Sequence, residues 1–105
     1  MKQLRTSNGV FAVVATEISK KVLINNPSGF HMRPKAAFVE AASKFDSDVK
    51  LVWSGQAFNG KSMFELMLVA APQGDEIELF VQGSDAPEAF EHLEKILAEV
   101  EPSQE

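Results

Sequence analysis

The residues best suited to chemistry lie around a single histidine near the end of the first third of the chain. A turn-forming stretch, residues 27–29, precedes His31, and Arg33 and Pro34 follow it. Proline is favoured in the first turn of a helix, so we expect His31 at or just before a helix N-terminus. That position offers backbone N–H groups and a partial positive charge, both of which suit an anion. The pattern predicts a site where a phosphoryl group rests on an imidazole ring.

The neighbours of His31 support this interpretation, because a lone histidine is more often an ordinary surface or core residue. Unperturbed imidazole titrates at roughly pH 6.5, so at neutral pH much of it is an uncharged nucleophile. The phosphoryl dianion that results needs compensating charge, and the Arg33 guanidinium can supply charge-assisted hydrogen bonds. Holding a phosphoryl group on the ring in this way needs no metal or cofactor.

Length and composition limit the other possibilities. The 105 residues suffice for one domain, and 45% of them are hydrophobic, so a real core is expected. The net charge of −5 argues against nucleic-acid binding. Cysteine is absent, which excludes disulfides and thiolate metal sites, and only two histidines are present. No apolar run approaches the roughly 20 residues of a membrane helix, so no membrane insertion is expected.

Hydrophobic periodicity and turn signals predict the elements that position this site. The expected strands cover residues 20–25, 49–53, 56–59 and 76–82, and the expected helices cover 32–44, 63–70 and 86–100. Short connections and a hairpin turn at Ser54 and Gly55 indicate a mostly antiparallel sheet with helices on one face. The predicted fold class is therefore α+β.

The helix starts carry two further signals. Ser62 and Glu65 fit a capping box, in which the serine needs no role beyond capping. Asp85, with Ser84, is expected to cap the last helix. His92 lies on that helix beside its apolar stripe, and we interpret it as a solvated residue.

Two motifs together resemble the HPr family, the histidine-containing phosphocarrier proteins of the bacterial phosphoenolpyruvate-dependent sugar phosphotransferase system. The stretch 29–34, Gly-Phe-His-Met-Arg-Pro, resembles the active-site motif of the family. The stretch 61–70 resembles its second signature, around a regulatory serine, and the spacing from His31 to Ser62 agrees. The resemblance implies an HPr-like open-faced sandwich, with a four-stranded mostly antiparallel sheet and three helices on one face.

The resemblance also implies roles for the residues that match the first motif. His31 corresponds to the histidine that Enzyme I phosphorylates on Nδ1 and that passes the group to enzyme IIA. Arg33 corresponds to the arginine beside the phosphohistidine, and Pro34 to the proline that follows. Ser28 falls where a small polar residue contacts the ring of the active-site histidine.

In the second motif, Ser62 corresponds to the serine that a dedicated kinase, the HPr kinase/phosphorylase, modifies in some bacteria. Met63, Phe64 and Met67 fall on the short helix that contributes to the partner surface of the family. They cannot all face inward on so short a helix, so core packing and docking remain alternatives for each of them.

Some residues depart from the usual family pattern, and they bear on the choice of partners rather than on the phosphoryl chemistry. They are Phe30, Met32, Lys35 and Glu65.

We expect a cytoplasmic, monomeric carrier that relays phosphoryl groups stoichiometrically rather than a catalyst. The domain is expected over residues 18–101, with an N-terminal extension of unknown structure at 1–17 and a tail at 102–105. The extension has a faint signal-peptide shape, but an added strand or a weakly packed tail fits it better.

Two alternatives to the carrier stay open. The first is a regulatory HPr-like binding protein, switched at Ser62 or His31 without sugar transport. The second is a small interaction module without phosphochemistry, in which His31 is buried or unreactive.

Overall fold

The computed structural model describes residues 16–100. Its elements are β1 (Thr16–Leu23), α1 (Met32–Ala42), β2 (Asp48–Trp53), β3 (Gln56–Asn59), α2 (Met63–Leu66), β4 (Glu76–Gly83) and α3 (Ala86–Ala98). The predicted order of strands and helices is confirmed. Predictions that concern residues 1–15 and 101–105 lie outside the described residues.

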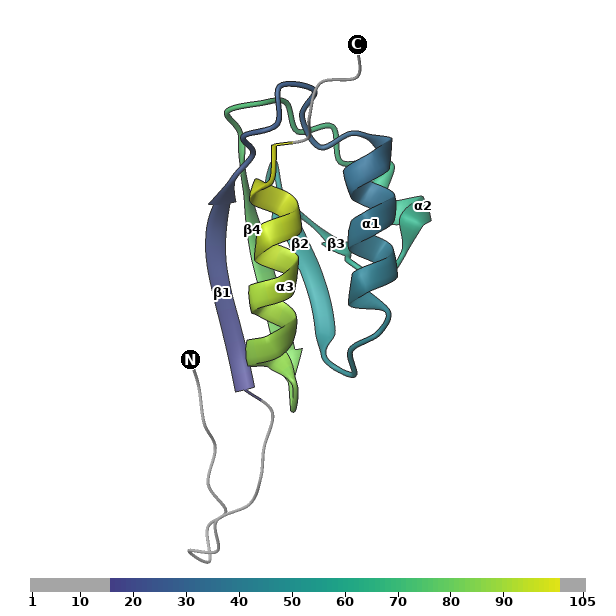
Figure 1. Cartoon of the computed structure of the whole chain (residues 1–105), viewed down its shortest axis with the longest axis vertical. Coiled ribbons are helices and arrows are strands. Elements are labelled where there is room, and N and C mark those ends of the chain that lie inside the picture. Colours follow the sequence, from purple (N-terminus) through teal and green to yellow (C-terminus); the bar gives the residue numbers. More distant parts are fainter. Residues whose placement is uncertain (1–15, 101–105) are drawn as a thin grey trace, which may run out of the picture.

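The sheet has the order β1-β4-β2-β3, and each of these pairs is antiparallel. The long helices α1 and α3 lie side by side over one face, and α2 lies beside α1 near the β3 edge (Figure 1). The predicted open-faced sandwich is confirmed, and all of the described pairings are antiparallel.

Period-two alternation decides which side of each strand faces the helices. In β1, Val22 is buried whereas its neighbour Leu23 is 47% exposed. Val22 pairs with Ile77 of β4, and Leu79 of the same strand pairs with Leu51 of β2, so one apolar layer crosses the sheet. Helix α3 covers that layer with residues spaced three and four apart, namely Ala86, Ala89, Phe90, Leu93 and Leu97.

Two element boundaries differ from the sequence-based expectation for tertiary reasons. Strand β1 begins at Thr16 rather than at residue 20, because β4 extends to Gly83 and pairs with it. Helix α2 has four residues rather than the eight expected over 63–70. The N–H groups of Leu68 and Val69 bond to carbonyls three residues back, which tightens and ends the helix.

The other helices end close to the expected positions. Helix α1 stops at Ala42, two residues early, where the Ser43 hydroxyl donates to the Val39 carbonyl at 2.8 Å. Asp85 is the N-cap residue of α3, as predicted, but its side chain makes no capping hydrogen bond, so that part of the prediction is wrong. Its carboxylate instead accepts the backbone N–H groups of Asp46 and Ser47 at 2.8 and 2.9 Å.

Several loops meet at one end of the sheet, at the top of Figure 1, where α1 begins. There the Asn25 carbonyl accepts the Gln73 side-chain amide, and the Asn25 side chain donates to the carbonyl of Ala98. The Trp53 indole N–H donates to the Asp75 carboxylate at 2.9 Å. The backbone of the loop from β1 to α1, which carries the candidate site, is thus tied to the loop before β4 through the Asn25 carbonyl. Between residues 16 and 100, none of the helices has the length and apolar character that a membrane crossing needs.

Candidate functional site

His31 is the N-cap residue of α1, as predicted, with extended backbone angles (φ −92°, ψ −168°). Its side chain is half-buried, and its carbonyl accepts the N–H of Lys35 at 3.0 Å, the first hydrogen bond of the helix. The side chain of His31 does not cap the helix, and the first turn contains no acidic residue. The N-terminal amides of α1, which have no intrahelical partner, therefore adjoin the imidazole ring without a carboxylate nearby in that turn.

The turn before His31 is fixed against the segment that follows α2. Gly29 has a φ of +71°, and a Cβ atom at this position would lie 2.6 Å from the carbonyl oxygen of Ala71. The next N–H, that of Phe30, donates to the same oxygen at 2.9 Å. The Phe30 ring is buried and meets Phe38 edge-to-face, with centroids 6.2 Å apart. The backbone hydrogen bond of Phe30 and the packing of its ring in the core therefore fix the position of the residue directly before His31.

Asn26 makes a contact with the ring that the sequence interpretation missed. Its side-chain Nδ2 lies 3.4 Å from Nε2 of His31, and the residue is only 5% exposed. By itself, the Asn-Pro-Ser-Gly run indicates only the end of a strand. The sequence did contain a signal for this contact. Asn26 continues the alternation of the buried Val22 and Ile24, which predicts a buried amide, and a buried amide needs a hydrogen-bond partner.

The other predicted site residues differ in exposure. Arg33 is exposed, and Pro34 is buried against the helix-covered core. Ser28 is exposed, and its backbone N–H lies 3.5 Å from Oδ1 of Asn26, so a contact of its side chain with the ring stays a prediction.

Lys35, one of the departures from the family pattern, is largely buried. Its exposed fraction is 7%, and its Nζ lies 5.8 Å from the centroid of the Phe30 ring. Desolvation by burial lowers the pKa of Lys35 below its ordinary value. The aliphatic part of the Lys35 side chain therefore packs near Phe30, the residue before His31.

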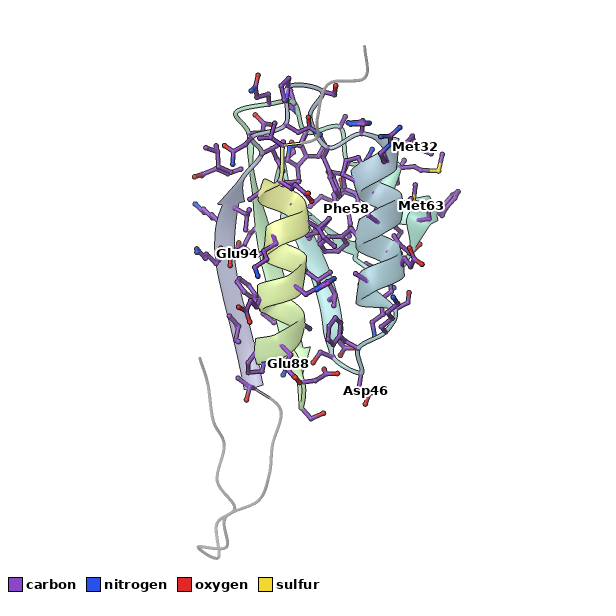
Figure 2. All side chains as sticks on the ribbon, viewed as in Figure 1. Met32, Asp46, Phe58, Met63, Glu88 and Glu94 are labelled. Carbon is purple, nitrogen blue, oxygen red and sulfur yellow. The ribbon has the colours of Figure 1, made fainter. Side chains whose placement is uncertain are left out.

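Large apolar side chains are exposed on α1, whose N-cap residue is His31, and on α2, which contacts α1, and we call this group the apolar patch. Its members come from α1, α2 and the turn after α2, and they are Met32 (54% exposed), Phe64 (79%), Met67 (54%) and Leu68 (61%). Met63 is half-buried, and Figure 2 shows it on α2 near Met32. The prediction that the α2 residues do not all face inward is confirmed, whereas Met32 and Leu68 were not predicted as members.

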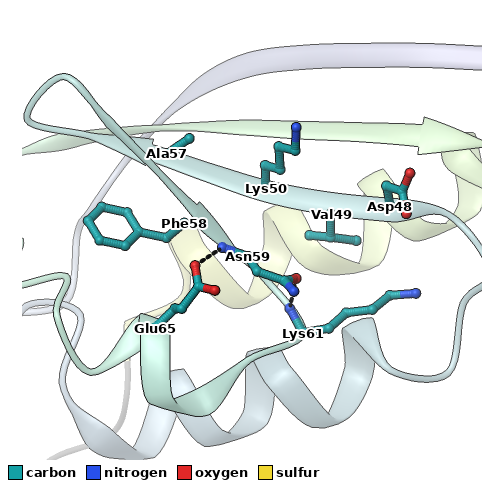
Figure 3. A pocket seen from close by; sticks show the side chains of 8 residues that line it. All are labelled: Asp48, Val49, Lys50, Ala57, Phe58, Asn59, Lys61 and Glu65. Carbon is teal, nitrogen blue, oxygen red and sulfur yellow. Dashed lines mark hydrogen bonds between the residues drawn. The ribbon is translucent and has the colours of Figure 1, made fainter.

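Ser62 caps α2, as predicted, by accepting the backbone N–H of Glu65 at 3.2 Å. The second half of the predicted capping box is wrong, because the Glu65 carboxylate accepts the N–H of Asn59 at 2.8 Å (Figure 3) rather than that of Ser62. The Ser62 N–H donates to the Asn59 carbonyl instead. Asn59 thus holds the turn between β3 and α2 from both of its backbone groups.

The second histidine lies away from this site. His92 is exposed on α3, and its ring lies 6.2 Å from that of Phe45. In the part of the chain that the structure describes, no three His, Asp or Glu side chains gather closely enough to hold a metal ion.

Comparisons with known proteins agree with this geometry. The family model described as the PTS HPr component phosphorylation site matches residues 18–99. The chain is 40% identical over 81 residues to the phosphocarrier protein HPr of Buchnera aphidicola subsp. Acyrthosiphon pisum, covering 77% of this chain and 95% of that protein. It is also 41% identical over 76 residues to the HPr-like protein Crh of Bacillus subtilis, covering 72% of this chain and 89% of that protein.

A solved structure supports the same assignment. The crystal structure of HPr from Bacillus anthracis str. Ames matches with a TM-score of 0.73 and 33% identity, over 77% of this chain and 96% of that chain. Sequence and fold therefore agree over nearly the whole described region. The chain belongs to the HPr family, the phosphocarrier proteins of the phosphotransferase system.

Proposed function

We propose that His31 is the residue on which this phosphocarrier holds its phosphoryl group, accepting it from Enzyme I and passing it to an enzyme IIA. The observation that carries the proposal is the place of a half-buried imidazole at the N-terminus of α1, in a first turn without acidic residues. The exposed guanidinium of Arg33 lies two residues along the same turn.

In this proposal the ring reacts as the tautomer whose proton is on Nε2, so that the lone pair of Nδ1 can attack the phosphorus atom of the phosphorylated donor. The proton on Nε2 passes to water once the phosphoryl group is bound to Nδ1. The bond from phosphorus to the donor breaks, and its electron pair stays on the donor. The first amides of α1 and the Arg33 guanidinium compensate the negative charge that arrives on the ring. Pro34 leaves the third helical position without an N–H and fixes its backbone for the helix. The protein is a stoichiometric carrier, because the same bond must break again when the acceptor attacks.

The apolar patch supplies the docking surface for these partners. Phe64 and Met67 are exposed at α2, and Met32, the residue that follows the phosphorylated histidine, is exposed on α1, which contacts α2. Large apolar side chains this exposed are typical of interaction sites. We propose that Enzyme I and the enzyme IIA both cover this patch, in the cytoplasm. A monomer suffices, because one chain provides the histidine, the arginine and the patch.

A phosphorylation assay tests the proposal. The protein is incubated with phosphoenolpyruvate and Enzyme I, and intact mass is measured before and after mild acid. We expect an acid-labile phosphate on the wild-type protein and on His92→Ala, and none on His31→Ala. Circular dichroism should show that His31→Ala keeps its fold, since a half-exposed side chain contributes little to stability. A His31→Ala protein that still takes up phosphate would refute the assignment.

One observation supports the regulatory alternative, the 41% identity with the HPr-like protein Crh of Bacillus subtilis, whose solution structure is described as that of the catabolite repression HPr. In that case Ser62 would be modified by the HPr kinase/phosphorylase, and the patch would bind a regulator. Phosphorylation of Ser62 without uptake of phosphate from Enzyme I would favour this second candidate.

A further inference from the structure

Asn26 is a buried polar residue whose side chain is directed at the imidazole of the site. It is 5% exposed, and it lies at the end of the extended segment that follows β1. Its carbonyl accepts the N–H of Gly29 at 2.7 Å, which closes the turn before His31. This backbone bond does not depend on the Asn26 side chain, so the amide group is available for another purpose.

The hydrogen-bond network fixes which atom of the amide faces the ring. Oδ1 of Asn26 lies 3.5 Å from the N–H of Ser28, a group that can only donate. Nδ2 therefore faces Nε2 of His31, at 3.4 Å. An amide NH₂ group can only donate, so this contact favours the form of the ring in which Nε2 accepts, because a proton on Nε2 would point at another donor. The separation is long for a hydrogen bond, so the effect is expected to be modest.

We propose that Asn26 is a positioning residue that disfavours a proton on Nε2 of His31 while Nδ1 carries the phosphoryl group, and that thereby prolongs the lifetime of the phosphorylated ring. The inference rests on the proposed function, in which the phosphoryl group is bound to Nδ1.

The chemistry of phosphoryl loss explains the effect. Water attacks phosphorus and releases a proton, the bond between Nδ1 and phosphorus breaks, and its electron pair returns to the ring. If Nε2 carries a proton, the ring leaves as neutral imidazole. If Nε2 is unprotonated, the ring leaves as an anion and must then take a proton from water, which is less favourable. A donor facing Nε2 disfavours the proton there and so slows this hydrolysis.

The test compares the lifetime of the phosphohistidine in full-length variants. Wild type, Asn26→Ala, Asn26→Asp and the control Asn25→Ala are phosphorylated with phosphoenolpyruvate and Enzyme I, and the donors are then removed. The remaining phosphohistidine is followed by mass at fixed neutral pH. Asn25 is a matched control, because it is the adjacent asparagine, is exposed, and donates to the Ala98 carbonyl instead of the ring.

We expect Asn26→Ala to shorten the half-life by roughly three- to tenfold, the size of one neutral hydrogen bond. The carboxylate that Asn26→Asp introduces can only accept, so it would favour a proton on Nε2 and shorten the half-life further. Asn25→Ala should match the wild type. In the unphosphorylated proteins, ¹⁵N NMR of the His31 ring should show a larger share of the Nε2–H tautomer in both Asn26 variants than in wild type.

A merely structural role of Asn26 predicts a lower thermal midpoint without this order of half-lives and without the tautomer shift. Equal half-lives in wild type and Asn26→Ala, or an unchanged tautomer, would overturn the inference while leaving the proposed function intact. A wild-type protein that takes up no phosphate would instead refute the proposed function, and the lifetime effect with it.

Discussion

The carboxylate of Glu65 accepts the backbone N–H of Asn59 at 2.8 Å (Figure 3), while the N–H of Glu65 itself donates to the Ser62 hydroxyl. One residue therefore closes the turn between β3 and α2 with its side chain and binds the cap of α2 with its backbone. The arrangement also places a negative charge in the turn that carries Ser62. A phosphate on Ser62 would enter a turn that already contains this carboxylate.

The first prediction separates the capping role of Ser62 from a regulatory one. Ser62→Ala removes the cap and should lower the stability by about 1 kcal/mol, which corresponds to a fall of about 4–8 °C in the thermal midpoint. It should leave the rate of phosphoryl transfer from Enzyme I unchanged. Ser62→Asp keeps a capping oxygen but adds a charge beside Glu65 and the apolar patch, so it should slow transfer.

Ser62→Asn is the matched control, because it caps a helix without adding charge. Stopped-flow transfer rates and thermal midpoints of the three variants test the two roles separately. If Asp, Asn and Ala all transfer at the same rate, Ser62 is a helix cap and nothing more.

The second prediction concerns the apolar patch. Phe64 is 79% exposed, so Phe64→Ala should cost far less stability than the roughly 3–5 kcal/mol of a buried phenylalanine truncation. It should weaken binding of Enzyme I by more than about 1 kcal/mol, as anchors near interface centres do. Isothermal titration calorimetry measures the binding, and Leu23→Ala, an exposed apolar residue on the opposite sheet edge, is the control. A large loss of stability with unaltered binding would make Phe64 a core residue.

The third prediction concerns the charge that faces the phosphoryl group. Arg33→Lys keeps the positive charge but loses the planar fork of donors. Because Arg33 is exposed, the fold should be unaffected, and transfer should slow by roughly tenfold, the size of a charge-assisted hydrogen bond. Rapid-quench measurements on Arg33→Lys and Arg33→Ala give the comparison. Equal rates in all three proteins would leave Arg33 without a role in transfer.

The fourth prediction is a pH dependence at the opposite end of the sheet. The Ser47 hydroxyl, followed by the Asp46 N–H, holds the pKa of the Asp85 carboxyl below its ordinary value of 3.8. A lowered folded-state pKa adds stability above the unfolded value, and this stability is lost as the pH falls through the folded value. Asp85→Asn should therefore be less stable than wild type at pH 7, and the difference should shrink below about pH 4.

Urea unfolding at several pH values measures this difference. Asp48→Asn, an exposed residue of β2, is the matched control and should not show the same trend. A constant difference between wild type and Asp85→Asn across the whole pH range would contradict the prediction.

Much of this protein was determined by its sequence alone. The turn before His31 and the proline after Arg33 are local signals, so they correctly placed the histidine at the N-terminus of α1. Period-two alternation identified β2 and β4, and the hairpin at Ser54 and Gly55 correctly predicted where β3 begins. Such signals succeed because turn chemistry and side-chain periodicity depend on neighbours a few residues away.

Tertiary structure decided the contacts between segments that are distant in the sequence. Helix α2 ends after four residues, and the segment that follows it packs against the turn before His31. In that contact the Ala71 carbonyl accepts the N–H of Phe30. Asp85 leaves its own helix uncapped because its carboxylate binds the loop that precedes β2. Propensity cannot predict either outcome, since each depends on which partner the fold brings within hydrogen-bond distance.

The site itself divides in the same way. The sequence indicated the imidazole, the guanidinium and part of the apolar patch, because residue type and local spacing carry their chemistry. Only the fold turned Asn26 toward Nε2 of His31 and left Met32 exposed beside α2. The physical reason is that a turn brings Asn26 back against the ring, and the meeting of α1 with α2 decides which apolar side chains remain uncovered.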